Sequence, residues 1–162
     1  MTRSAKVGED VNISDLHGSL TALEQVLAQL APWQPDHYLL LGDLLNHGPR
    51  NPVPAGYDPA AVAARLNQLA PRIMAVRGNC DSEVDQMLLH FPITAPYNQL
   101  LVDGRRWFVS HGHLYEPSNV PLPAREPVHQ RSYPCACTMS GRRDDPDEPG
   151  GYLFSKGRVG GQ

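Results

Sequence analysis

The chain has 162 residues, a formal net charge of −3, 41% hydrophobic residues and 19% charged residues. This length suits one domain with a buried core, and this composition is typical of a globular protein. The slightly acidic balance argues against a dedicated nucleic-acid surface, but it leaves a phosphate substrate open because a bound metal would set the local charge. No long apolar run occurs, so no membrane span is expected. The three cysteines form no disulfide framework, which favours a cytoplasmic location.

One pattern recurs along the chain: a short apolar run ends in polar residues that can bind a metal. Four such runs, 11–13, 38–41, 73–76 and 107–110, are predicted to be buried parallel strands. In parallel sheets the functional groups gather beyond the carboxyl ends of the strands. The pattern therefore predicts that one rim of the sheet collects five side chains, namely Asp15, His17, Asp43, Asn79 and His111.

A helix is predicted directly after the first of these strands. Ser19 is a good N-cap for a run of leucines at helical spacing, and Pro32 ends the helix. The start of this helix would lie beside Asp15 and His17. Its free backbone N–H groups would then favour an anion at that point.

Two further helices, a long loop and a hairpin complete the expected elements. Asp58 before Pro59 is typical of an N-cap followed by the first helical position, and the segment 82–85 resembles a capping box. The loop 44–57 is long and rich in proline, and loops of this length are usually functional. The runs 99–102 and 105–110, joined by an Asp-Gly pair, are predicted to form a hairpin.

The five rim residues form a plausible set of ligands for two metals. Asp15 and His17 are two residues apart, so on an extended segment both side chains would face one metal. Asp43 could bridge that metal to a second one, which Asn79 and His111 would bind. Two such metals form the usual clamp for in-line attack at phosphorus, and mixed oxygen and imidazole ligands suit Mn, Fe, Ni or Zn. Taken singly, each residue also fits a turn or an exposed polar position.

The order of these motifs resembles the calcineurin-like metallophosphoesterase superfamily, and most closely its small bacterial phosphodiesterases of the YfcE type. The resemblance covers about residues 13–119 and rests on the segments 15–17, 42–50, 77–85 and 111–113. It implies an α/β fold of the α/β/β/α sandwich type and two divalent metal ions, with Mn preferred. It also implies hydrolysis of a small phosphodiester by a hydroxide that bridges the two metals.

The resemblance also assigns roles to single residues. Asp43, Asn79 and Cys80 take catalytic positions, and Asp15, His17, Asp43, Asn79 and His111 take the metal positions. Many members have a histidine as general acid where this chain has Cys80, and a thiol replaces imidazolium poorly. Substrates with good leaving groups should therefore react best. Asn46, Arg50 and His113 are candidate substrate contacts, and for Asn46 and Arg50 a role in holding the loop is an equal alternative.

The chain departs from the family pattern after residue 118. The family ends with a Gly-His-x-His segment, which is absent after His113, and proline, arginine, aspartate and glycine dominate from residue 119 onward. We therefore predict a metallophosphoesterase core over 1–118 and an atypical tail over 119–162 that is disordered or frame-altered. The sandwich would be incomplete in its second sheet. A non-catalytic protein-interaction module and an inactive truncated copy are the alternatives, and a homo-oligomer stays open.

Overall fold

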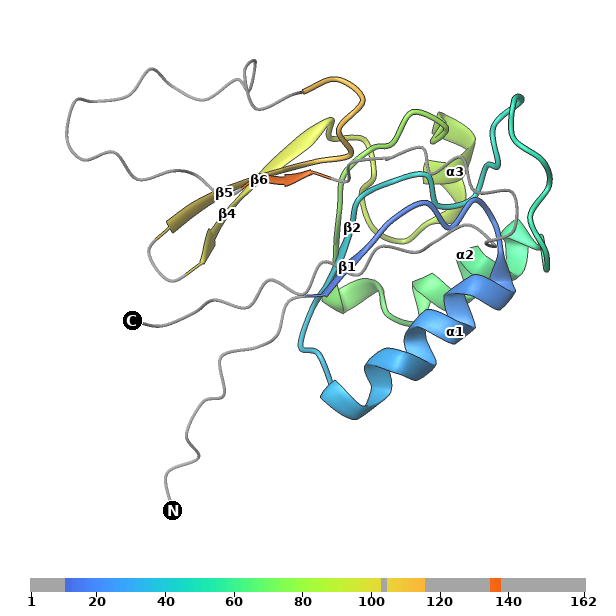
Figure 1. Cartoon of the computed structure of the whole chain (residues 1–162), viewed down its shortest axis with the longest axis horizontal. Coiled ribbons are helices and arrows are strands. Elements are labelled where there is room, and N and C mark those ends of the chain that lie inside the picture. Colours follow the sequence, from blue (N-terminus) through green and yellow to red (C-terminus); the bar gives the residue numbers. More distant parts are fainter. Residues whose placement is uncertain (1–10, 103–104, 116–134, 138–162) are drawn as a thin grey trace, which may run out of the picture.

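The structure is a computed structural model that describes residues 11–102, 105–115 and 135–137 (Figure 1). Within those ranges, no helix is long and apolar enough to cross a bilayer. The helices and strands alternate along most of the chain. In order they are β1 (Val11–Ile13), α1 (Leu20–Leu30), β2 (Tyr38–Leu40), α2 (Pro59–Asn67), β3 (Ile73–Ala75), α3 (Glu83–Leu88), β4 (Tyr97–Val102), β5 (Arg105–Ser110) and β6 (Cys135–Cys137), with 3-10 turns at Ala31–Trp33 and Ala70–Arg72.

The first sheet is parallel and has the order β1-β2-β3. Its central strand β2 is buried along its whole length, as a parallel strand between two layers should be. Helices α1 and α2 lie together on one side of this sheet (Figure 1). Leu23, Leu40 and Leu66 belong to the main apolar core, which forms between these helices and the sheet. The parallel arrangement points the three strand ends toward one rim.

The predicted helix starts are confirmed by their caps. The Ser19 side chain accepts a hydrogen bond from the backbone N–H of Ala22, and the Asp58 side chain does the same for Ala61. Both contacts satisfy N–H groups that have no partner inside the helix. The capping box of α3 is also present, with reciprocal bonds between residues 82 and 85. These local signals were enough to place all three helices.

The second sheet corrects one prediction. The run 107–110 is not a fourth parallel strand of the first sheet; it belongs to β5, which pairs antiparallel with β4 and parallel with β6. Strands β4 and β5 instead form the hairpin that was predicted from the runs 99–102 and 105–110, so that prediction is confirmed. A small core of Leu39, Leu41, Val76 and Val109 joins the two sheets. The predicted mixed α/β class, with a parallel sheet and a second, smaller sheet, is confirmed.

The atypical tail predicted over 119–162 contains one strand within the described residues, β6. Cys135–Cys137 pairs with β5 over three residues. Such a short run of small residues carries no periodic signal, so sequence patterns do not reveal it. The rest of the tail, 119–134 and 138–162, lies outside the described residues. The domain boundary at residue 118, the disorder or frame change of the tail and the incompleteness of the second sheet therefore stay predictions.

Candidate metal centre

The backbone at the rim brings the ends of β1 and β2 together. The N–H of Asp15 bonds to the carbonyl of Gly42 over 3.2 Å, and that of His17 bonds to the carbonyl of Asp43 over 2.9 Å. Asp15 and His17 have φ angles of 57° and 46°, so the expected extended segment is wrong. Two left-handed residues curl the chain here. The His17 Nε2 atom nevertheless lies 3.6 Å from Oδ1 of Asp15, so the two side chains still lie close together.

The ring of His17 is oriented by a backbone carbonyl. Its Nδ1 atom lies 2.9 Å from the carbonyl oxygen of Asn46. A carbonyl only accepts, so Nδ1 carries a proton and Nε2 faces the carboxylates of Asp15 and Asp43. Metal-binding histidines in proteins are typically held in this way by an outer partner. The hydrogen bond to Asp15, opposed by burial and supported by the Asn46 carbonyl and the charge of Asp43, raises the pKa of His17 to about 9.

His111 is oriented in the same manner from the second sheet. Its Nδ1 atom lies 2.8 Å from the carbonyl oxygen of Leu41, and its Nε2 atom lies 3.0 Å from Oδ1 of Asn79. With Nδ1 facing the carbonyl of Leu41, Nε2 is the ring atom that faces the amide oxygen of Asn79. Imidazole and amide oxygen together suit a divalent cation.

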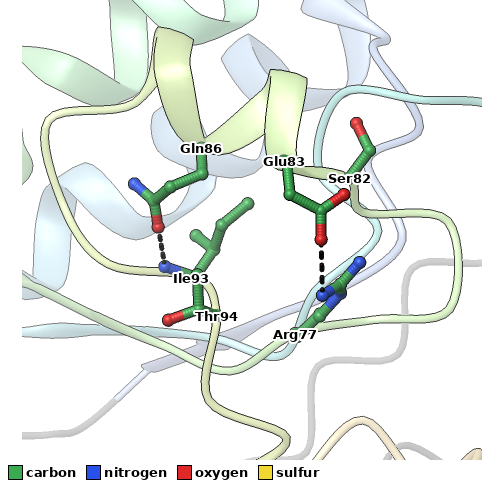
Figure 2. Close-up of a pocket in the computed structure, with 6 residues that line it drawn as sticks. All are labelled: Arg77, Ser82, Glu83, Gln86, Ile93 and Thr94. Atoms are coloured by element: carbon green, nitrogen blue, oxygen red, sulfur yellow. Dashed lines mark hydrogen bonds and ion pairs between the residues drawn. The ribbon is translucent and has the colours of Figure 1, made fainter.

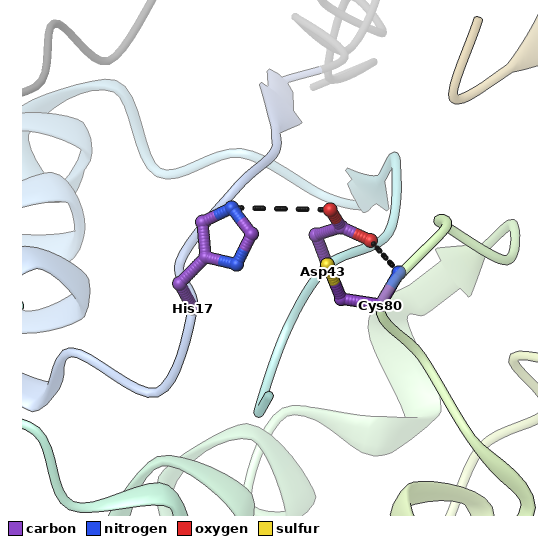
Figure 3. A group of neighbouring side chains, drawn as sticks. All are labelled: His17, Asp43 and Cys80. Atoms are coloured by element: carbon purple, nitrogen blue, oxygen red, sulfur yellow. Dashed lines mark hydrogen bonds and ion pairs between the residues drawn. The ribbon is translucent and has the colours of Figure 1, made fainter. Parts of the chain in front are cut away.

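Asp43 is the centre of the group. Its Oδ2 atom lies 3.8 Å from Nε2 of His17 and 3.6 Å from Nε2 of His111. Its Oδ1 atom accepts a hydrogen bond of 2.8 Å from the backbone N–H of Cys80 (Figure 3). The side chain is only 3% exposed. One buried carboxylate oxygen therefore lies between two imidazoles from different sheets.

Two groups of ligand atoms are close enough to bind cations, and they share Asp43. His17, Asp43 and Cys80 form the first group, while Asp15, Asp43 and His111 form the second; within each, the ligand atoms lie within 4.8 Å of one another. The donors are carboxylate oxygen, imidazole nitrogen and sulfur, with the amide of Asn79 beside them. This donor set fits divalent transition-metal ions. Asp43, which both groups share, occupies the position expected of a bridging ligand.

The charge state of the metal-free group is set by mutual contacts. Burial raises the pKa of Asp15, but hydrogen bonds from His17 and Ser14 and the charge of the nearby imidazoles outweigh it, so the pKa lies below 3.8. Burial, followed by the charge of Asp43, raises the pKa of the Cys80 thiol to about 12. The thiol is therefore protonated at neutral pH.

Of the predicted substrate residues, Asn46 and His113 contact histidines of this group. The Asn46 side chain accepts a hydrogen bond from the N–H of Gly48 over 2.9 Å, while its carbonyl holds His17. This geometry agrees with the loop-holding alternative. Arg50 is exposed on the same loop. His113 is also exposed, with its ring 5.2 Å from that of His111, and burial and the neighbouring imidazole lower its pKa.

The expected anion site at the start of α1 is wrong. The N–H of Leu20 donates to the carbonyl of Gly56, and the N–H of Ala22 donates to the Ser19 side chain. The Ser19 hydroxyl also donates to the carbonyl of Ala55 over 2.7 Å. The end of the long loop therefore covers this helix terminus. Sequence spacing could not reveal the loop contact, because its partners lie 36 residues apart.

One important residue was missed. Asp81 follows the Gly-Asn-Cys run and received no role, yet it is only 4% exposed and bonds to three backbone N–H groups at the rim. The available signal was its place directly after candidate ligands. Its burial is decided by the approach of β2 and β3, which local sequence does not specify.

A parallel sheet with a second, smaller sheet, and a rim of carboxylates and imidazoles around one shared aspartate, define a phosphoesterase-type metal centre. The chain belongs to the calcineurin-like phosphoesterase family, whose family model matches residues 11–147.

Two phosphodiesterases of Escherichia coli strains are similar to this chain. The phosphodiesterase YfcE of strain K12 is 60% identical over 108 residues, which are 67% of this chain and 59% of that protein, and the same values hold for YfcE of O157:H7. The solved structure of YfcE, a phosphoesterase from E. coli, is 57% identical with a TM-score of 0.67 and covers 70% of this chain and 62% of that one. The chain thus spans less than two thirds of the length of these relatives.

Proposed function

We propose that the chain is a metal-dependent phosphodiesterase that hydrolyses a small phosphodiester with two divalent metals. The observation that carries this proposal is the position of Asp43 Oδ2, which lies 3.8 Å from Nε2 of His17 and 3.6 Å from Nε2 of His111. Both imidazoles are oriented by backbone carbonyls, so the inward nitrogens are preorganised as ligands. The family membership and the named phosphodiesterase relatives support the same reaction class.

The side chains divide the work between binding and orientation. Asp15 and His17 would hold one cation, Asn79 and His111 the other, and Asp43 both. Such cations supply charge neutralisation at the phosphoryl oxygens and a nucleophile from water at neutral pH. The carbonyls of Leu41 and Asn46 keep the imidazole protons on Nδ1, so Nε2 of each ring stays available for binding.

Cys80 limits the range of substrates. In the metal-free chain, burial and the charge of Asp43 raise the pKa of its thiol to about 12. A thiol also replaces an imidazolium poorly as a general acid. A leaving group that needs a proton would receive little help from it. We therefore propose that phosphodiesters with acidic leaving groups react best.

We also propose Mn²⁺ as the preferred metal, with Fe, Ni and Zn as alternatives. A cytoplasmic location and an assembly of identical chains belong to the same proposal.

Hydrolysis of bis(p-nitrophenyl) phosphate by the purified chain with Mn²⁺ tests the proposal. Asp43→Asn keeps the size of the side chain but removes the charge that would bind both cations, so turnover should fall to background. Asp36→Asn is a matched control, because Asp36 is exposed and precedes β2, at the end of that strand opposite to the ligands. Turnover that survives in Asp43→Asn, or none in the folded parent chain, would contradict the proposal.

A further inference from the structure

The carboxylate of Asp81 fastens two rim segments together. Its Oδ2 atom accepts hydrogen bonds from the N–H of Gly78 over 2.7 Å and of Asp43 over 2.8 Å. Its Oδ1 atom accepts a third from the N–H of Leu44 over 3.0 Å. The segment after β2 and the segment after β3 are thus tied to one buried charge. Hydrogen bonds to an ionised carboxylate are among the stronger ones in proteins.

These bonds act on the residue at the centre of the ligand group. Asp43 has a φ of 56°, a conformation that an aspartate adopts only when its surroundings hold it there. Its N–H points at Asp81, and its own Oδ1 accepts from the N–H of Cys80. The backbone and the side chain of Asp43 are therefore both fixed by the segment 78–81. This leaves Oδ2 directed at the two histidines.

Asp81 is in turn held from the outside by Arg77. The guanidinium donates from Nε and Nη2 to the backbone carbonyl of Asp81 over 3.2 and 3.0 Å, and its Nη1 pairs with Glu83 over 3.3 Å. Figure 2 shows this ion pair in a small pocket beside α3, which Ser82, Gln86, Ile93 and Thr94 also line. We assign no ligand to this pocket, because its arginine already bonds to the turn that carries Asp81.

We propose that Asp81 is a positioning residue for Asp43: its carboxylate holds the backbone of Asp43 in the left-handed conformation that directs Oδ2 between His17 and His111. The inference rests on the proposed function for its effect on metals. Its effect on the backbone is independent of that function. Asp81 would act through Asp43, because both of its carboxylate oxygens accept from backbone N–H groups of the rim.

Asp81→Asn is the sharpest variant. An amide oxygen in the place of Oδ2 could still accept from Gly78 and Asp43, but the NH₂ group would then face the N–H of Leu44, and two donors cannot bond. The segment should loosen at residues 43, 44 and 78. We expect faster hydrogen exchange at these three amides. We also expect Mn²⁺ to bind about 10–100-fold more weakly, the usual cost of losing an outer partner of a ligand.

Asp85→Asn is the matched control. Asp85 is 7% exposed, lies four residues away and accepts a backbone hydrogen bond from Ser82 over 2.8 Å, but it contacts the start of α3 and no residue of the ligand group. This variant also loses one buried carboxylate. It should lower the melting temperature while leaving the exchange of amides 43 and 44 and the Mn²⁺ affinity close to those of the parent chain.

The two readouts separate the possible failures. Unchanged exchange at residues 43, 44 and 78 in Asp81→Asn, relative to Asp85→Asn, overturns the inference whatever the activity. Faster exchange with unchanged Mn²⁺ affinity also overturns it, because Asp81 would then be only structural. If the parent chain binds Mn²⁺ but hydrolyses no phosphodiester, the proposed function fails while the inference is still decided by exchange and affinity. If the parent chain binds no Mn²⁺, the metal part of both proposals fails.

Discussion

The imidazole of His111 lies 3.6 Å from the carboxylate of Asp43, although the two residues follow strands of different sheets. Asp43 comes after β2 in the parallel sheet, and His111 comes directly after β5 in the second sheet. The ligand group therefore closes only when both sheets are packed together. The small core of Leu39, Leu41, Val76 and Val109 is what packs them. Metal binding should consequently be coupled to that packing.

Replacing His111 should remove one cation and nearly all activity. In His111→Ala we expect one Mn²⁺ per chain instead of two and a loss of turnover greater than the roughly 10–100-fold that an outer partner costs. Metal analysis after gel filtration, together with turnover of a chromogenic phosphodiester, checks this. His90→Ala is the control, because His90 is exposed and lies outside the ligand group. Two Mn²⁺ per chain in His111→Ala would disprove the assignment.

The metal-free chain should lose stability as the pH rises from 6.5 to 9. The hydrogen bond to Asp15 raises the folded-state pKa of His17 to about 9, above the value of 6.5 expected in the unfolded chain. The folded state therefore binds this proton more tightly, and the stabilisation is complete below pH 6.5 and disappears as the pH passes through 9. Thermal unfolding in the presence of a chelator, at pH 6, 7.5 and 9, measures this loss.

Asp15→Asn is the companion variant for that titration. It removes the carboxylate that contributes most to the raised pKa of His17, so the fall in stability should move to lower pH. In His17→Gln this component should vanish. A parent chain whose melting temperature stays level or rises over the whole range would show that the proton on His17 adds nothing to folding.

Cys80 should react slowly with alkylating reagents. Only the thiolate attacks, and burial together with the charge of Asp43 raises the pKa of Cys80 to about 12. At pH 7.5 iodoacetamide should therefore modify Cys80 of the metal-free chain much more slowly than it modifies glutathione. Mass spectrometry of the peptide that contains Cys80 distinguishes it from the other cysteines. Asp43→Asn should speed the reaction, and labelling at the rate of a free thiol would contradict the raised pKa.

The central strand should carry a large share of the stability. Leu40 is fully buried at 0% exposure in the core between the first sheet and its helices. Leu40→Ala should therefore lower the free energy of unfolding by about 2–5 kcal/mol through lost burial and a cavity. Met74 lies on the neighbouring strand β3 and is 40% exposed, which makes Met74→Ala a control with an effect of less than about 1 kcal/mol. Urea unfolding of both variants compares them. Equal losses would mean that β2 is not the centre of the core.

Local signals accounted for much of this fold. Ser19 and Asp58 cap helices as their sequence contexts predict, and the strand ends bring Asp15, His17, Asp43, Asn79 and His111 into mutual contact. A helix cap or an apolar run depends on only a few consecutive residues, so sequence patterns reveal it. The roles of the five residues in metal binding nevertheless stay predictions, since contact alone does not test them.

What sequence patterns did not reveal depends on contacts between distant segments. The left-handed backbone at Asp15 and His17 is held by bonds to residues after β2, and the burial of Asp81 exists only where two rim segments meet. The end of the long loop on the start of α1 is a contact of the same kind. None of these has a periodicity or a local composition that marks it. Each is fixed by the packing of the whole domain.

The backbone conformation of the rim places stability and the candidate metal ligands in conflict. Asp15, His17 and Asp43 are three of the four non-glycine residues with positive φ in the described part of the chain, and such conformations cost of the order of 1–3 kcal/mol each. Glycine would relieve that strain at every one of these positions. A laboratory selection for heat resistance alone should therefore drift toward glycine at the rim. The selected protein would be more stable but would lack ligands of the proposed metal centre. Directed evolution for stability should therefore also select for turnover.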